Sequence, residues 1–113
     1  MDLRQESVTG ATVLGVAGRI DSTTAPLLQP RLTSLMTETG TGVLLDLEKL
    51  DYISSAGFRV LLLAAKRADQ IGRRFAMCNV RGKVSQLFEL GGFLDLFSIS
   101  ATREDGVSVV AER

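Results

Sequence analysis

The apolar run at residues 43–47 (VLLDL) restricts the fold of this chain more than any other feature. A strand with one solvated face alternates apolar and polar side chains, whereas a strand covered on both faces is apolar at nearly every position. Only Asp46 interrupts this run. We therefore predict a central strand here, in a sheet that is covered on both faces.

The segments on either side of this run alternate between strand and helix patterns. Apolar residues at spacings of three and four predict helices, while short β-branched runs bounded by turn residues predict strands. The first two strands flank a Thr9-Gly10 turn, which favours an antiparallel hairpin. The expected strands are residues 3–8, 11–17, 43–47, 75–80 and 98–99, and the expected helices start near Thr24, Ser55 and Val84.

Alternation of this kind is typical of α/β proteins, in which right-handed crossovers place parallel strands side by side. We expect residues 1–113 to form a single domain, with a mixed, mainly parallel central sheet of about 4–5 strands and helices packed against it. The segment after Thr102 stays open. Acidic residues in its first turn favour a helix, whereas its valines favour a strand.

The helix after Ser55 carries two apolar stripes. The first includes Phe58 and Leu61 and is enough to pack on a sheet. The second includes Val60, Leu63 and Ala64, and it either widens the core or forms an exposed contact surface. We expect the core, because wide apolar stripes are common.

The charge balance and the residue types exclude several classes of protein. Thirteen basic and thirteen acidic residues cancel without a basic block, which argues against nucleic acid and anionic membranes as partners. The chain has no histidine, which removes Ser-His-Asp and Cys-His catalysis and nearly all zinc sites. The single cysteine, Cys78, cannot form an intrachain disulfide, and its apolar neighbours are typical of a buried strand. We therefore expect no catalytic residue, no metal and no cofactor.

The sequence also bears on where the protein works. It opens with no secretory signal and contains no apolar run of membrane length. A lone buried cysteine fits a reducing compartment. The expected location is the cytoplasm.

Ser54 and Ser55 stand where a helix is expected to begin. A serine hydroxyl at that point can accept a hydrogen bond from a first-turn N–H group. A helix start also carries partial positive charge and free donors, which suits a phosphate group. Either serine is thus a plain helix cap or a residue placed to carry a phosphate.

Two loops, at residues 18–25 and 47–57, each leave a predicted strand and enter a predicted helix. In parallel sheets such loops gather at the carboxyl ends of the strands. We expect them to lie side by side, with Asp21 near Ser55 and Asp51 close to both, as an acidic rim for a basic partner. Asp21 has a second interpretation, in which its carboxylate only caps the local backbone at Thr23 or Thr24.

Three segments resemble the STAS domains of anti-sigma factor antagonists. Residues 52–61 (YISSAGFRVL) resemble the family signature, whose usual form is Asp-Ser-Ser-Gly or Asp-Ser-Thr-Gly followed by a hydrophobic residue. Residues 18–21 (GRID) resemble the Gly-x-hydrophobic-Asp element, and residues 87–99 (LFELGGFLDLFSI) resemble the C-terminal helix, glycine turn and short strand. The three segments occur in the family's order and span most of the chain.

The resemblance implies a phosphorylation switch at Ser55, which follows the signature position that Ser54 occupies here in place of the usual aspartate. It implies two partners: an anti-sigma factor serine/threonine kinase of the histidine-kinase-like ATPase type, bound by the unmodified form so that a sigma factor is released, and a PP2C-type serine phosphatase. Such partner switching regulates transcription, for example in stress responses. The partner-binding residues that the resemblance implies are Asp21, Ser22, Thr23, Ser54, Ser55, Gly57 and Phe58.

Two other readings of the sequence stay open. One is a non-phosphorylated STAS scaffold or sensor in another signalling or transport-linked assembly. The other is a weak nucleotide hydrolase, against which the missing histidine and the lack of a glycine-rich phosphate loop both argue.

Overall fold

Strands and helices alternate along the chain, as the sequence predicts. The structure is a computed structural model, and it describes residues 1–111. The strands are β1 (Asp2–Val8), β2 (Ala11–Ile20), β3 (Gly42–Asp46), β4 (Leu50–Ile53), β5 (Phe75–Cys78) and β6 (Ile99–Ser100). The helices are α1 (Ala25–Glu38), α2 (Ser55–Gln70), α3 (Gly82–Leu90) and α4 (Arg103–Val110), with a short 3-10 turn, η1, at Leu94–Leu96.

The strands form one six-stranded sheet in the order β1-β2-β3-β5-β6, with β4 paired to β2 outside this path. β1 and β2 form the expected antiparallel hairpin, and every other pair is parallel. The ten-residue β2 is long enough to pair with β3 near its start and with β4 near its end. The predicted α/β class is therefore confirmed, with six strands in place of the smaller number expected.

β4 corrects the prediction that residues 47–57 form a loop. Leu50 and Ile53 are buried while Asp51 is exposed, so the four residues lie along the sheet as a short strand. A strand of this length gives too little alternation to be recognised from sequence alone. Its partner, the end of β2, is also remote in sequence, so no local signal announces the pairing.

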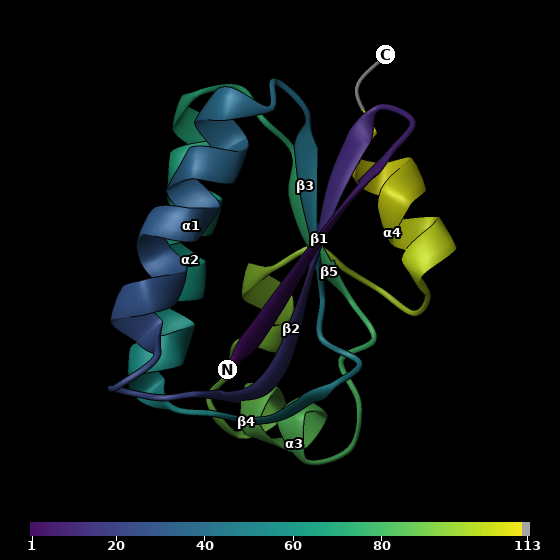
Figure 1. Ribbon diagram of the computed structural model, residues 1–113. Coiled ribbons are helices and arrows are strands. Elements are labelled where there is room, and N and C mark those ends of the chain that lie inside the picture. The colour runs from purple at the N-terminus through teal and green to yellow at the C-terminus, as the bar shows by residue number, and fades with distance from the viewer. Residues whose placement is uncertain (112–113) are drawn as a thin grey trace.

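The helices cover both faces of the sheet (Figure 1). α1 and α2 lie together on one face, α4 lies on the other, and α3 lies at the end of the molecule near β4. The segment after Thr102 is helical, and Thr102 caps α4: its Oγ1 accepts from Asp105 N at 3.2 Å. The segment is therefore a helix and not a strand. The cap pairs a first-turn N–H group that would otherwise lack a partner, and this stabilises the helix against the strand preference of the valines.

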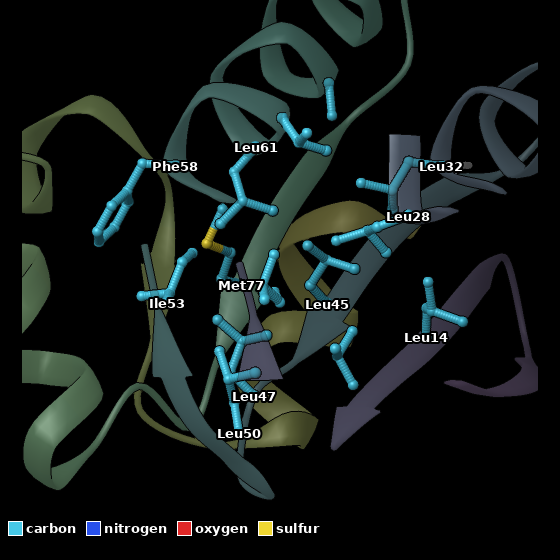
Figure 2. Close-up of a cluster of buried hydrophobic side chains, with 14 of the residues drawn as sticks. Leu14, Leu28, Leu32, Leu45, Leu47, Leu50, Ile53, Phe58, Leu61 and Met77 are labelled. Carbon is cyan, nitrogen blue, oxygen red and sulfur yellow. The ribbon is translucent and has the colours of Figure 1, made fainter. Parts of the chain in front are cut away.

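The larger core lies between the sheet and the α1–α2 layer. Leu14, Leu45 and Met77 project from neighbouring strands toward Leu28 and Leu32 of α1 and Leu61 of α2 (Figure 2). The next residues along the strands point to the other face. There Val13, Leu44 and Cys78 pack with Val110 of α4.

β3 is buried at all five positions. Burial on two faces explains its unbroken apolar run and confirms the predicted central strand. In the second stripe of α2, Val60 and Ala64 belong to the larger core as expected, whereas Leu63 is 42% exposed. Over residues 1–111, no helix combines the length and apolar character that a bilayer span needs.

Candidate functional site

The carboxyl ends of β2 and β4 meet at one edge of the sheet. Ile20 pairs with Ile53, and the backbone N–H of Ser54 donates to the carbonyl of Ile20 at 2.8 Å. The loop that holds Asp21 therefore lies directly beside the start of α2. The predicted neighbourhood of the two loops is confirmed, although a strand, β4, carries one of them to this edge.

The two serines have different surroundings. Ser54 is the N-cap of α2: its hydroxyl accepts from the N–H of Gly57 at 3.4 Å, and its carbonyl accepts from Phe58 N at 3.0 Å. Ser55 is the first helical residue and is exposed. Within residues 1–111 its hydroxyl makes no hydrogen bond. The structure thus assigns the cap to Ser54 and leaves the hydroxyl of Ser55 accessible.

Gly57 allows α2 to approach the sheet closely. It is buried, and a Cβ at this position would lie 2.7 Å from Ile53 Cγ1, 2.8 Å from Ile20 Cγ2 and 3.0 Å from the carbonyl oxygen of Ile20. Distances under 3.0 Å do not occur for real Cβ atoms without a shift of the neighbours. Gly57 therefore lies beneath the site, where it sets the position of Ser54 and Ser55.

Phe58 is also beneath the surface, with 5% of its area exposed. Its ring stacks on Phe93 with centroids 4.1 Å apart and meets the edge of Phe88 at 4.8 Å. These contacts tie the first turn of α2 to the end of α3. Little of the ring is accessible to a partner. Phe58 therefore stabilises the site from beneath and does not form its outer surface.

Asp21 shows the local cap that was one of its two interpretations. Its Oδ1 accepts from the N–H groups of Thr23 and Thr24 at 3.0 and 3.1 Å, and its own N–H donates to Thr24 Oγ1 at 2.9 Å. The backbone donors of Thr24 and Thr23 hold the pKa of this carboxyl below its usual value. Within residues 1–111, the partner of Oδ2 is the exposed Arg19, whose Nε lies 3.6 Å away. One carboxylate oxygen therefore stays at the surface, so capping and partner contact are compatible.

Exposed side chains form the outer part of the expected acidic rim around Asp21 and Asp51. Ser22 and Thr23 lie at the tip of the loop after β2, and Asp51 is exposed on β4. Tyr52, between Asp51 and Ile53, has the Arg19 guanidinium 4.4 Å and the Lys83 ammonium 5.6 Å from its ring centroid. Sequence reasoning missed this arrangement, because Lys83 reaches it from α3 and no local pattern links the two residues.

A second polar cluster was also missed. Asp46 is 5% exposed and accepts from Asn79 Nδ2 at 2.9 Å and from Arg103 Nη2 at 2.9 Å. Arg103 also pairs with Glu6 at 3.1 Å, so it links α4 to β3 and β1. Burial alone would raise the pKa of Asp46, but the bonds from Asn79, the Glu48 N–H and Arg103 outweigh it and hold the pKa below its usual value.

This cluster stabilises the fold and offers no nucleophile. Burial raises the pKa of the neighbouring Cys78 thiol to about 12, which keeps the sulfur protonated and unreactive. The only signal in the sequence was Asp46 itself, an acid inside an apolar run. No group of three or more His, Cys, Asp or Glu side chains in residues 1–111 is placed to hold a metal ion.

Comparison with known proteins places these features in a wider context. The family model described as STAS domain matches residues 3–106. BtrV of Bordetella bronchiseptica, named as a candidate anti-sigma factor antagonist, is 36% identical over 104 residues, which cover 92% of this chain and 90% of BtrV. The anti-sigma-B factor antagonist of Bacillus subtilis is 31% identical over 94 residues, which cover 83% of this chain and 85% of that protein.

Solved structures share the same architecture. An anti-sigma factor antagonist from Mycobacterium paratuberculosis superposes with a TM-score of 0.84 at 22% identity, covering 96% of this chain and 92% of that one. The Bacillus cell fate determinant SpoIIAA in its phosphorylated form gives a TM-score of 0.71 at 16% identity, covering 95% of this chain and 97% of that one. At these low sequence identities, the likeness shows a shared fold and nothing more specific.

Proposed function

Because this chain belongs to the STAS domain family, we propose that it is an anti-sigma factor antagonist controlled by phosphorylation of Ser55. The unmodified form binds an anti-sigma factor serine/threonine kinase of the histidine-kinase-like ATPase type and so frees a sigma factor. Phosphorylation weakens that complex, and a PP2C-type phosphatase restores it. The relatives from Bordetella and Bacillus support the antagonist role through their names.

The observation that carries the proposal is the difference between the two serines. The hydroxyl of Ser55 is exposed at the first position of α2, whereas the hydroxyl of Ser54 is engaged by Gly57 N. A kinase that modified Ser54 would have to break the cap, which is worth about 0.5–2 kcal/mol. Modification of Ser55 breaks no hydrogen bond within residues 1–111.

The position of Ser55 also suggests how the switch acts. A phosphate near the start of a helix is favourable by about 0.3–1 kcal/mol when exposed, so the folded domain accommodates it. Inside an interface, however, a phosphate carries about two negative charges that must lose their hydration. The modification therefore acts on the bound complex and leaves the fold of the free protein intact.

Intact-mass analysis after incubation with a candidate kinase and Mg-ATP tests the proposal. We expect one added phosphate on the wild type, one on Ser54→Ala and none on Ser55→Ala. Circular dichroism of both variants shows that the substrates are folded. Labelling that persists in Ser55→Ala and disappears in Ser54→Ala would move the site to Ser54.

A scaffold or sensor function is the second candidate. The observation that favours it is Ser54, which stands where the family usually has an aspartate and so leaves Ser55 without one nearby charge. In that case no cognate kinase would label the chain. A phosphate installed at Ser55 would then also leave the binding of its partners unchanged.

A further inference from the structure

One face of α2 continues outward from Ser55 as a stripe of exposed side chains. Arg59 lies one turn after Ser55, Leu63 lies one turn further, and Lys66 and Arg67 follow. At about 100° per residue, Arg59, Leu63 and Lys66 lie within about 80° of Ser55 around α2, and Arg67 lies further round the helix. The first cation that a group on Ser55 would meet along this stripe is Arg59.

Arg59 is free to meet such a group. Within residues 1–111 its guanidinium makes no hydrogen bond and no ion pair. The other arginine near the site, Arg19, lies against Tyr52 and Asp21. Arg103 is held in the cluster with Asp46 and Glu6 on the opposite face. Of these three arginines, Arg59 is the one whose guanidinium has no hydrogen bond or ion pair within residues 1–111.

We propose that Arg59 receives the phosphate of a modified Ser55 as an ion pair within α2. Residues at i and i+4 of a helix have Cβ atoms about 5–6 Å apart, well within the reach of an arginine, and an anion on the N-terminal side of a cation is the favoured orientation. The planar guanidinium can donate two parallel N–H groups to phosphate oxygens. The partial positive charge at the start of α2 also favours an anion at this position.

The pair changes what a partner would meet. A phosphoserine carries about two negative charges at neutral pH, and one arginine neutralises about half of them. Phosphorylation then alters two exposed positions together, since it adds an anion at position 55 and withdraws the cation at position 59. This inference rests on the proposed function only in assuming that Ser55 is the modified residue.

A phosphate titration followed by 31P NMR tests the ion pair. Phosphoserine is installed at position 55 by genetic encoding, so that no kinase is needed. A neighbouring cation favours the dianion and lowers its second pKa, which is about 6 in a free phosphoserine. We expect Arg59→Gln to raise this pKa by about 0.3 units at low ionic strength, and we expect high salt to reduce the difference.

The matched control is Arg67→Gln, which removes an equal charge from the exposed surface of α2 about three turns beyond Ser55. It should leave the phosphate pKa close to that of the unsubstituted chain, while Arg59→Lys should show an intermediate value because it keeps the charge and loses the planar fork. Equal pKa values with Arg59 and with Arg59→Gln would overturn the inference. Equal shifts from Arg59→Gln and Arg67→Gln would also overturn it, because they would show only a general field.

The result is independent of the outcome for the proposed function. If Arg59→Gln raises the phosphate pKa but no kinase modifies Ser55, the ion pair is supported and the proposed switch is not. If a kinase modifies Ser55 but Arg59→Gln leaves the titration unchanged, the switch stands and the ion pair fails.

Discussion

The backbone N–H of Ser54 donates to the carbonyl of Ile20 at 2.8 Å, and this bond joins the residue that follows β4 to the last residue of β2. It fixes the start of α2 beside the loop that follows β2. Gly57 allows the helix to approach closely enough for the bond to form. The phosphoacceptor candidate and the acidic rim thus depend on one contact between two strand ends.

Replacing Gly57 with alanine should disturb this contact. The new Cβ would lie within 3.0 Å of buried side-chain atoms of Ile53 and Ile20, and overpacking of this kind costs about 1–3 kcal/mol, more than the helical preference of alanine returns. Because alanine returns up to about 1 kcal/mol through its helical preference, we expect urea unfolding to show a net loss of up to about 2 kcal/mol. Gly15→Ala is the control, because its Cβ would lie 3.7 Å from the nearest atom. Equal stability of the two variants would contradict the packing argument.

Asp21→Asn tests whether the carboxylate contacts the partner. Asparagine keeps an oxygen that can accept from Thr23 N and Thr24 N, so the variant should fold normally. Loss of the charge should weaken binding of the anti-sigma kinase at least tenfold, or about 1.4 kcal/mol, by calorimetry. Asp69→Asn, an exposed acid near the far end of α2, should bind like the wild type. Unchanged affinity of Asp21→Asn would reduce Asp21 to a cap.

Ser55→Asp should leave thermal stability nearly unchanged, because an anion in the first turn of a helix is favourable by about 0.3–1 kcal/mol. Ser54→Ala should melt several degrees lower, since a lost cap costs about 0.5–2 kcal/mol and each kcal/mol shifts the melting temperature of a small domain by about 4–8 °C. Calorimetric melting of both variants measures this contrast. A large drop for Ser55→Asp would instead indicate that charge at this position distorts the domain.

The cluster around Asp46 should make the stability of the fold depend on pH. Since folding lowers the pKa of Asp46, its ionised form contributes to stability above the pKa of the unfolded chain, and the contribution is lost as the pH falls through the lower folded value. Asp46→Asn should lose about 1.5–3 kcal/mol at pH 7, because Arg103 and Asn79 lose a charged acceptor. The free energy of unfolding, measured in urea at pH 7 and pH 3, should fall less on acidification in Asp46→Asn than in the wild type. An identical pH dependence would show that Asp46 carries little of it.

The sequence predicted those features that have a local or periodic cause. Burial of β3 on both faces produces the apolar run at residues 43–47, and the spacing of Phe58 and Leu61 reflects the buried side of α2. β4 was missed because its stability comes from pairing with the end of β2, which local alternation does not encode. The sequence does not decide between helix and strand after Thr102, because the acidic first turn favours a helix and the valines favour a strand.

The site was predictable to a similar degree. The pair Ser54 and Ser55 marked the helix start, but only the geometry divides them into a cap and an exposed hydroxyl. Gly57 and Phe58 were expected at a partner surface and are buried, because a motif does not distinguish residues that shape a site from those that face outward. The contacts of Arg103 with Asp46 and of Lys83 with Tyr52 join distant segments, so no pattern could announce them.

The affinity of the anti-sigma kinase for the unmodified protein and for the protein with phosphoserine encoded at position 55 tests the central claim most directly. Calorimetry should show a complex with the unmodified form and at least tenfold weaker binding of the modified form. Phosphoserine encoded at position 108, an exposed serine on α4 across the sheet, controls for added charge and should bind like the unmodified protein. Equal affinities for the unmodified and Ser55-modified forms, or an equal loss from the modification at position 108, would contradict the account.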